Sequence, residues 1–415
     1  MKIGYSCAPL TINARTDKRI VSKKFTNEEF IESLRENLKN LKLILAHNID
    51  NDIHLFRISS DILDNSTHYN NSTDWTNILS VEIAQISNLI KNNDIRVTMF
   101  PQKYTLLNSP NIDVVKKSIA FLNEHIKFMK ALKLDTSHKI ILEIGGVYTN
   151  KKAAIERFID VYSELSQDIK DRLILANDVK NYSFDDVLAI CKILSAPMLF
   201  NTLYDKISKS NDLTLLEKLD MVSDTWKSTY GKMIIHYSQQ NHSKKKGEQS
   251  DTIFTDKFIA FYNTIQKFQS DVTLESNDGD ISALKCHNII KELEGHKFTS
   301  KDLIKEHSKY KLLLIEKGNN FNKKTLGIAT STNSMIDFYK IIDESLESFI
   351  DKKGFMIALR DSLRLIGDII KQSEKNHIEK LMLNNKLKRC KNYMYEIAIR
   401  NNATVLLETY FFSQL

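Results

Sequence analysis

Eight short apolar runs, each closed by polar or small residues, constrain the fold of this chain of 415 residues more than any other feature. Runs that are apolar throughout indicate strands of a parallel sheet buried on both faces. Helical stretches separate the runs, and eight such repeats are what a closed (β/α)₈ barrel needs. Because the carboxyl ends of barrel strands form one face, we expect the closing residues to share one pocket. The runs are 3–7, 55–60, 95–100, 140–146, 173–178, 198–201, 233–238 and 272–275.

Local signals place the helices between these runs. Thr26 and Glu29 form a capping-box pattern at the start of the first helix, and Ser183 opens another helix in a similar way. After about residue 295 the alternation of strand and helix stops, and amphipathic helical patterns follow. The sequence therefore predicts a (β/α)₈ TIM barrel over residues 1–290 and a basic α-helical extension over residues 291–415.

Composition restricts where such a protein works and what it binds. Four widely spaced cysteines without a Cys-x-x-Cys pair fit a reducing compartment, so we expect an intracellular protein of the cytoplasm or nucleus. No run is apolar and long enough to span a bilayer, and the start at Met1 leads directly into a strand rather than a signal peptide. Residues 291–415 hold 22 Lys and Arg against 16 Asp and Glu, which fits either a phosphate-rich partner or a solvated helical surface.

An ordered set of motifs resembles the UV-damage endonuclease (UvdE) family, whose barrel is similar to that of endonuclease IV. The resemblance runs from about residue 1 to 285 and does not cover the helical extension. It implies a metal-dependent endonuclease of DNA repair that nicks DNA 5′ to ultraviolet photoproducts with several divalent ions, often manganese. The motifs are Gly4-Tyr5-x-Cys7, Phe56-Arg57-Ile58-Ser59-Ser60, Pro101-x-x-Tyr104, Leu107-Asn108-Ser109-Pro110, Gly145-Gly146-x-Tyr148, Arg157-Phe158, Asn177-Asp178, His236-Tyr237-Ser238 and Leu274-Glu275.

The resemblance also shows that most metal-ligand positions of the family carry other residues here. His236, Asp251 and Glu275 are kept, and Glu143 stands where the family has a histidine. Ala176 replaces a glutamate that bridges metals in the family, and its side chain has no donor atom. The lost ligand positions are Phe100, Ala176, Asn201, Tyr204, Ile234 and Gln249.

Two interpretations of the kept residues stay open. His236, Asp251, Glu275 and Glu143 form a residual metal site for one weakly bound divalent ion such as Mn²⁺, or the protein holds no metal. In the second case we expect His236 and Glu275 to hydrogen-bond to each other inside the barrel, because buried polar groups need partners.

Contact with DNA does not require the metals. The resemblance places Lys103 and Tyr104 at the position of a pair that probes DNA lesions, and it adds Tyr5 and Arg57 to the expected DNA-binding residues. Tyrosine stacks on bases and lysine contacts phosphates. The alternatives are that Tyr104 packs on neighbouring loop leucines and that Arg57 forms an internal ion pair, for example with Asp178.

We therefore expect a DNA-binding repair protein, with ultraviolet-damaged duplex as partner and with cleavage weak or absent, which makes the chain a pseudoenzyme. One alternative is a structural or interaction protein that uses the barrel as a scaffold and residues 291–415 to dock a protein partner. Another is an active metal-dependent DNA endonuclease with an altered site. A small-molecule pocket is a third, because barrels of this shape also isomerise sugars.

Overall fold

The computed structural model describes residues 1–18, 25–63, 73–208 and 211–413. The chain divides into two compact units, which are described separately. Met1–Ala8, Ala14–Ser250 and Asn263–Ser276 form the first unit, and Pro9–Asn13, Asp251–Tyr262 and Asn277–Leu415 form the second. The assignment of separate roles to residues 1–290 and 291–415 stays a prediction.

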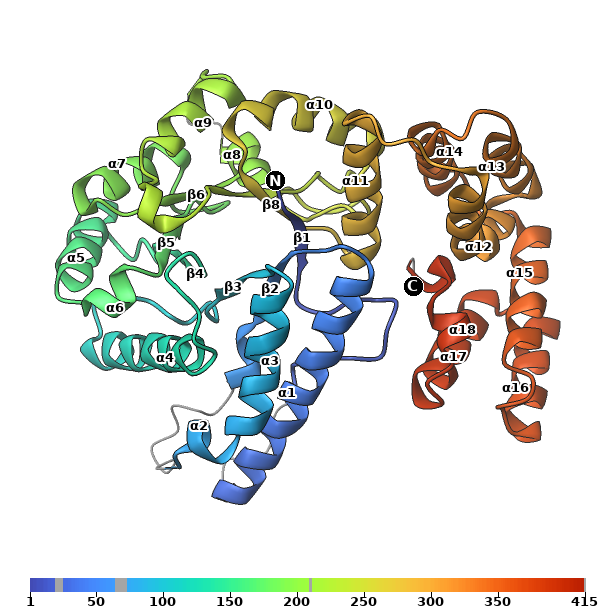
Figure 1. Cartoon of the computed structure of the whole chain (residues 1–415), viewed down its shortest axis with the longest axis horizontal. Helices are drawn as coiled ribbons and strands as arrows, with labels where there is room; N and C mark the ends of the chain where they lie inside the picture. The colour runs from blue at the N-terminus through green and yellow to red at the C-terminus, as the bar shows by residue number, and fades with distance from the viewer. Residues whose placement is uncertain (19–24, 64–72, 209–210, 414–415) are drawn as a thin grey trace. The chain divides into compact units, whose positions relative to one another are not determined.

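The first unit contains a closed barrel of eight parallel strands that neighbour one another in sequence order (Figure 1). This confirms the fold predicted from the eight apolar runs. Each observed strand is four or five residues long and lies within one of those runs or at its edge. The strands are β1 Ile3–Ser6, β2 Leu55–Ser59, β3 Arg96–Phe100, β4 Lys139–Glu143, β5 Leu173–Ala176, β6 Met198–Asn201, β7 Ile234–Tyr237 and β8 Asp271–Leu274.

Helices follow the strands, and their first turns use the capping residues that the sequence indicates. The Thr26 side chain accepts a hydrogen bond from the Glu29 amide, and Glu29 accepts one from the Thr26 amide. Ser183 caps its helix in the same reciprocal way. Up to the last strand the helices are α1 Asn27–Asp50, α2 Trp75–Ile78, α3 Ser80–Asn92, α4 Ile112–Ala131, α5 Lys151–Ser163, α6 Gln167–Lys170, α7 Phe184–Leu194, α8 Thr202–Ser208, α9 Leu215–Ser223 and α10 Thr255–Ile265.

The barrel interior is built in levels, because residues two apart on a strand point to the same face. A buried apolar level consists of Ile141, Ile174, Leu199 and Ile234, with Ala176 packed against them. Two residues further along the strands, the next level carries Glu143, Ala176, Asn201 and His236. The apolar level therefore supports a polar level at the carboxyl ends of the strands.

The second unit is helical beyond the last strand, which confirms the predicted C-terminal helices. Its core draws on α12, α15, α16 and α17 and includes Leu312, Leu359, Ile378, Met394 and Phe411. In the described part of the chain, no helix combines the length and the apolar character needed to cross a membrane. The helices are α11 Asp280–Leu293, α12 Ser300–Lys317, α13 Asn319–Ser331, α14 Met335–Glu347, α15 Lys352–Leu365, α16 Gln372–Leu383, α17 Leu387–Arg400 and α18 Thr404–Leu407.

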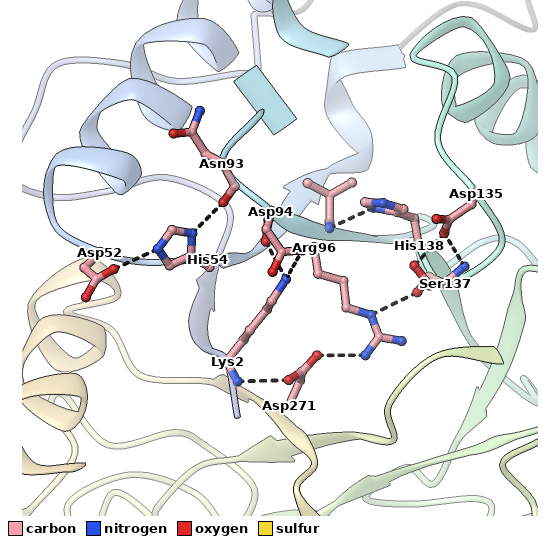
Figure 2. Close-up of polar contacts among 11 residues, drawn as sticks. Lys2, Asp52, His54, Asn93, Asp94, Arg96, Asp135, Ser137, His138 and Asp271 are labelled. Atoms are coloured by element: carbon pink, nitrogen blue, oxygen red, sulfur yellow. Dashed lines mark hydrogen bonds and ion pairs between the residues drawn. The ribbon is translucent and has the colours of Figure 1, made fainter. Parts of the chain in front are cut away.

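The amino ends of the strands are tied together by buried charges (Figure 2). The Arg96 Nη1 atom lies 2.9 Å from Asp271 Oδ2 and 2.7 Å from the carbonyl oxygen of Lys232. Its Nε donates to the carbonyl of Ser137 at 2.9 Å, and the other Asp271 oxygen accepts the Lys2 amide. Arg96 and Asp271 are both buried. This ion pair joins β3 to β8 across the barrel axis, so it closes the end of the barrel opposite the polar level.

We predict that Asp271→Ala destabilises the first unit by about 3–5 kcal/mol, because it leaves the Arg96 guanidinium buried without its counter-charge. The matched control is Asp220→Ala, which removes the exposed ion pair between Lys267 and Asp220. That change costs less than about 1 kcal/mol. Urea unfolding followed by circular dichroism measures both losses. Equal losses in the two variants would contradict the role given to the buried pair.

Candidate functional site

The carboxyl ends of the strands surround a cavity of about 560 Å³, which we call the barrel mouth. The polar level of the interior forms its floor. In the strand register, Glu143 lies beside Ala176 and Asn201 lies beside His236. The lining residues used below are Arg57, Phe100, Lys103, Glu143, Ala176, Asp178, Asn201, Tyr204, His236, Gln249 and Glu275.

Glu275, which directly follows β8, is the carboxylate of the barrel mouth that three side chains contact. Its Oε1 lies 2.7 Å from Arg57 Nη1 and 3.2 Å from His236 Nδ1. Its Oε2 accepts a hydrogen bond from Asn201 Nδ2 at 3.0 Å. Burial opposes the charge on Glu275, but His236 and Arg57 outweigh burial and hold the pKa of Glu275 well below its usual value. Glu275 is therefore a fully partnered anion, and the predicted contact between His236 and Glu275 is confirmed.

His236 completes this arrangement through its Nδ1 atom, which faces Glu275. Burial lowers its pKa, despite the nearby Glu275 carboxylate, and Arg57 lowers it further. A neutral ring that donates from Nδ1 to Glu275 leaves a lone pair on Nε2. Within the described residues, that Nε2 atom is buried and has no hydrogen-bond partner. The floor of the mouth thus contains one buried imidazole nitrogen without a partner among the described residues.

Arg57 is the cation of the mouth that pairs with Glu275. It comes from the middle of β2, and its guanidinium lies over the Phe100 ring, 5.5 Å from the ring centre. The alternative expectation of an internal ion pair is correct for Arg57, but the suggested partner Asp178 is not. The Asp178 carboxylate instead accepts the amides of Lys180, Asn181 and Tyr182 and so shapes the loop after β5.

Glu143 is the carboxyl group of the mouth whose pKa is shifted upward toward neutral pH. Burial raises its pKa to about 7, and Asp178 contributes in the same direction. Lys103 and Arg57 act against this rise. Glu143 is therefore poised between its protonated and ionised forms near neutral pH.

The structure separates the predicted DNA-binding residues. Lys103 lines the mouth and is exposed, and the Tyr104 side chain beside it is 62% exposed, with its ring 6.2 Å from that of Phe121. Tyr5 is fully buried and its hydroxyl donates to Asn48, which removes it from the residues able to contact DNA.

Strand parity explains the burial of Tyr5. Tyr5 pairs in register with Phe56, and the two rings pack edge to face, whereas Ser6 pairs with Arg57. Neighbouring residues of a strand point to opposite faces. Since Arg57 points into the barrel, Tyr5 points outward, toward the helices. The alternation of residues along the two strands, with Tyr5 paired to Phe56 and Ser6 to Arg57, is the feature that separates Tyr5 from Arg57.

The predicted residual metal ligands also fall in two places. His236, Glu275 and Glu143 line the barrel mouth, whereas Asp251 belongs to the second unit, where its Oδ1 accepts a hydrogen bond from Asn277 at 2.6 Å. A site for one weak ion formed by these residues stays a prediction.

The donor set does not fit the multi-metal cluster that the resemblance implies. Among the residues described, no group of three or more His, Cys, Asp and Glu side chains is placed to hold a metal ion. The side chains of Phe100, Ala176 and Ile234 offer no lone pair. Glu275, the kept carboxylate at the floor of the mouth, already shares its oxygens among the Arg57 guanidinium, the His236 imidazole and the Asn201 amide.

Two lost ligand positions have taken roles that sequence reasoning missed. Asn201 donates to Glu275, and its own Oδ1 accepts the Tyr204 amide at 3.2 Å. Phe100 packs against the Arg57 guanidinium. Tyr204 and Gln249 also line the mouth, and burial raises the pKa of Tyr204 to about 12. No sequence signal indicates these contacts, since they depend on which strands become neighbours.

Comparison with known proteins identifies the family. The family model of the UV-endonuclease UvdE matches residues 4–310. The chain belongs to the UvdE family. A UV DNA damage endonuclease of Clostridium perfringens is 39% identical over 398 residues, which cover 96% of this chain and 96% of that protein. The crystal structure of SacUVDE matches with a TM-score of 0.67 and 32% sequence identity, over 71% of this chain and all of that one.

The helical extension is not a general property of the UvdE relatives. A UV DNA damage endonuclease of Bacillus cereus is 26% identical and covers 72% of this chain, although the match takes in 96% of the Bacillus protein. The Clostridium protein, in contrast, matches nearly the whole chain. It therefore shares most of the helical region as well as the barrel.

We predict that Glu143→Gln makes the stability less dependent on pH. The folded-state pKa of about 7 lies above the ordinary value, so the stability that protonated Glu143 contributes is present below about pH 4.5 and is lost as the pH rises through 7. Relative to the wild type, the free energy of unfolding of the variant therefore rises by up to about 2–3 kcal/mol between pH 4.5 and pH 8. Urea unfolding across this range measures the difference, with the exposed Glu156→Gln as control. A difference that is flat with pH would refute the assignment.

Proposed function

We propose that this member of the UvdE family is a DNA-binding protein of ultraviolet-damage repair whose cleavage of DNA by the family's metal-dependent route is weak or absent. The observation that carries the proposal is the complete partnering of Glu275 by Arg57, His236 and Asn201. This carboxylate is the one that the resemblance retains on the last strand. Its charge is already neutralised from within the protein.

Charge balance explains why the mouth is stable without a metal cluster. Several bare carboxylates at one buried site would repel one another, so their loss together with the metals removes a penalty. Arg57 supplies one fixed positive charge in contact with Glu275, and Phe100 holds the guanidinium in place. A cation that took Glu275 as ligand would have to displace Arg57 into a buried site without its counter-charge, which is costly.

The support for DNA as partner comes from family membership and from the rim of the mouth. Lys103 lines the cavity and is exposed, and the exposed Tyr104 is the next residue in the chain. An exposed aromatic ring stacks on an unpaired base, and a neighbouring ammonium group contacts phosphate. We assign lesion contact to Tyr104 and backbone contact to Lys103, and we assign no bond-breaking step to any residue.

We predict that the purified protein nicks ultraviolet-irradiated plasmid in Mn²⁺ no faster than its Glu275→Gln variant. The reason is that the residual donor set does not assemble the cluster on which the reaction depends. Conversion of supercoiled to open-circle plasmid measures nicking, and elemental analysis of the same preparation measures bound metal. Fast nicking by the wild type that Glu275→Gln abolishes, with several metal ions per chain, would show an active endonuclease instead.

We predict that Tyr104→Ala lowers the preference for irradiated over undamaged duplex by about 1–3 kcal/mol, the value of one stacked base. Lys103→Ala weakens binding to both duplexes alike, and it lowers by about one the slope of the logarithm of the binding constant against the logarithm of the salt concentration. Fluorescence anisotropy at several salt concentrations measures these effects, with the exposed lysine variant Lys116→Ala as control. Wild-type protein that binds neither duplex at low salt would favour the scaffold function over the proposed one.

A further inference from the structure

The helical unit contains a polar groove between α16 and α17. The two helices run from Gln372 to Leu383 and from Leu387 to Arg400, and only three residues connect them. Their inner faces are anchored in the core of the unit through Ile378, Leu387 and Met394. The groove on their outer side has a volume of about 430 Å³. The core contacts of these three residues therefore hold in place the two helices that form the groove.

Cations and hydrogen-bond donors dominate the lining of this groove. Lys380, Lys386 and Arg389 lie along it and are exposed, and Glu396 is the one carboxylate among its lining residues. His377, Asn384 and Asn392 add further polar groups, while Leu381 and Tyr393 supply the apolar part. The groove is therefore rich in positive charge and poor in the large apolar anchors that protein interfaces use at their centres.

Lys380, Lys386 and Arg389 form no ion pair within the part of the chain that the structure describes. Other cations of the same region are paired, since Lys391 lies 2.7 Å from Glu316, and Arg400 contacts Glu374. Like charges that lie close together and outnumber the one nearby carboxylate favour an anionic ligand that neutralises several of them at once.

We propose that the groove between α16 and α17 is a second DNA-binding surface that grips the phosphate backbone through Lys380, Lys386 and Arg389. The identity of the anion as DNA rests on the proposed function, whereas the site itself rests on the groove. Backbone contacts carry no sequence or lesion information. The groove therefore adds affinity for duplex DNA in general, and the barrel mouth inspects the damage.

The charge-reversed triple variant Lys380→Glu, Lys386→Glu and Arg389→Glu tests this proposal in the full chain. We expect its dissociation constant for undamaged and irradiated duplex to rise at least tenfold at moderate salt, with the salt slope lower by about two to three. The matched control reverses Lys352, Lys353 and Arg360, three exposed cations of the same unit outside the groove, with the same change in net charge. The control should bind within about threefold of the wild type.

A neutral triple variant with glutamine at the same three positions guards against misfolding, and circular dichroism checks that each variant keeps its helices. Ultraviolet cross-linking of the bound duplex, followed by peptide mapping, should place DNA on residues 372–396. Unchanged binding by both groove variants, or an equal loss in the control, would overturn the proposal while leaving the proposed function intact. Binding of a polyglutamate peptide at the groove more tightly than DNA would also overturn it. A wild type that binds no DNA would overturn both.

Discussion

The ion pair between Arg57 and Glu275 is the interaction on which the barrel mouth depends. Both groups are largely withdrawn from water, and a buried charge is tolerated only with a partner of opposite sign. His236 and Asn201 then satisfy the remaining hydrogen-bonding capacity of the carboxylate. This small network neutralises the Glu275 carboxylate with groups of the protein itself.

The two ends of the barrel use buried charge for different purposes. At the amino end, Arg96 and Asp271 bond to each other and to backbone groups of neighbouring strands and loops, as in Figure 2. These contacts join strands on opposite sides of the barrel and stabilise its closed form. At the carboxyl end, polar groups face a cavity, and the buried His236 Nε2 atom has no hydrogen-bond partner among the described residues. A barrel that carries function at its carboxyl ends and stability at its amino ends follows the general rule for this fold.

The sequence predicts the fold well because its signals are local or repeated. Barrel strands are buried on both faces, so each appears as a run of apolar residues, and the capping box at Thr26 lies within four residues. The site is less predictable because its contacts cross the chain. Arg57 and Glu275 are 218 positions apart, and only the closure of the barrel decides that Glu275, rather than Asp178, is the partner. The role of Asn201 and the placement of Asp251 in the other unit were hidden for the same reason.

Anomalous diffraction from crystals soaked in Mn²⁺ tests the central claim most directly, because it locates ions and side chains in one measurement. The account predicts that Glu275 keeps its contacts with Arg57 and His236 and that no cluster of manganese peaks forms in the barrel mouth. Two or three manganese peaks among the strand ends, with Glu275 turned away from Arg57 to coordinate them, would contradict it.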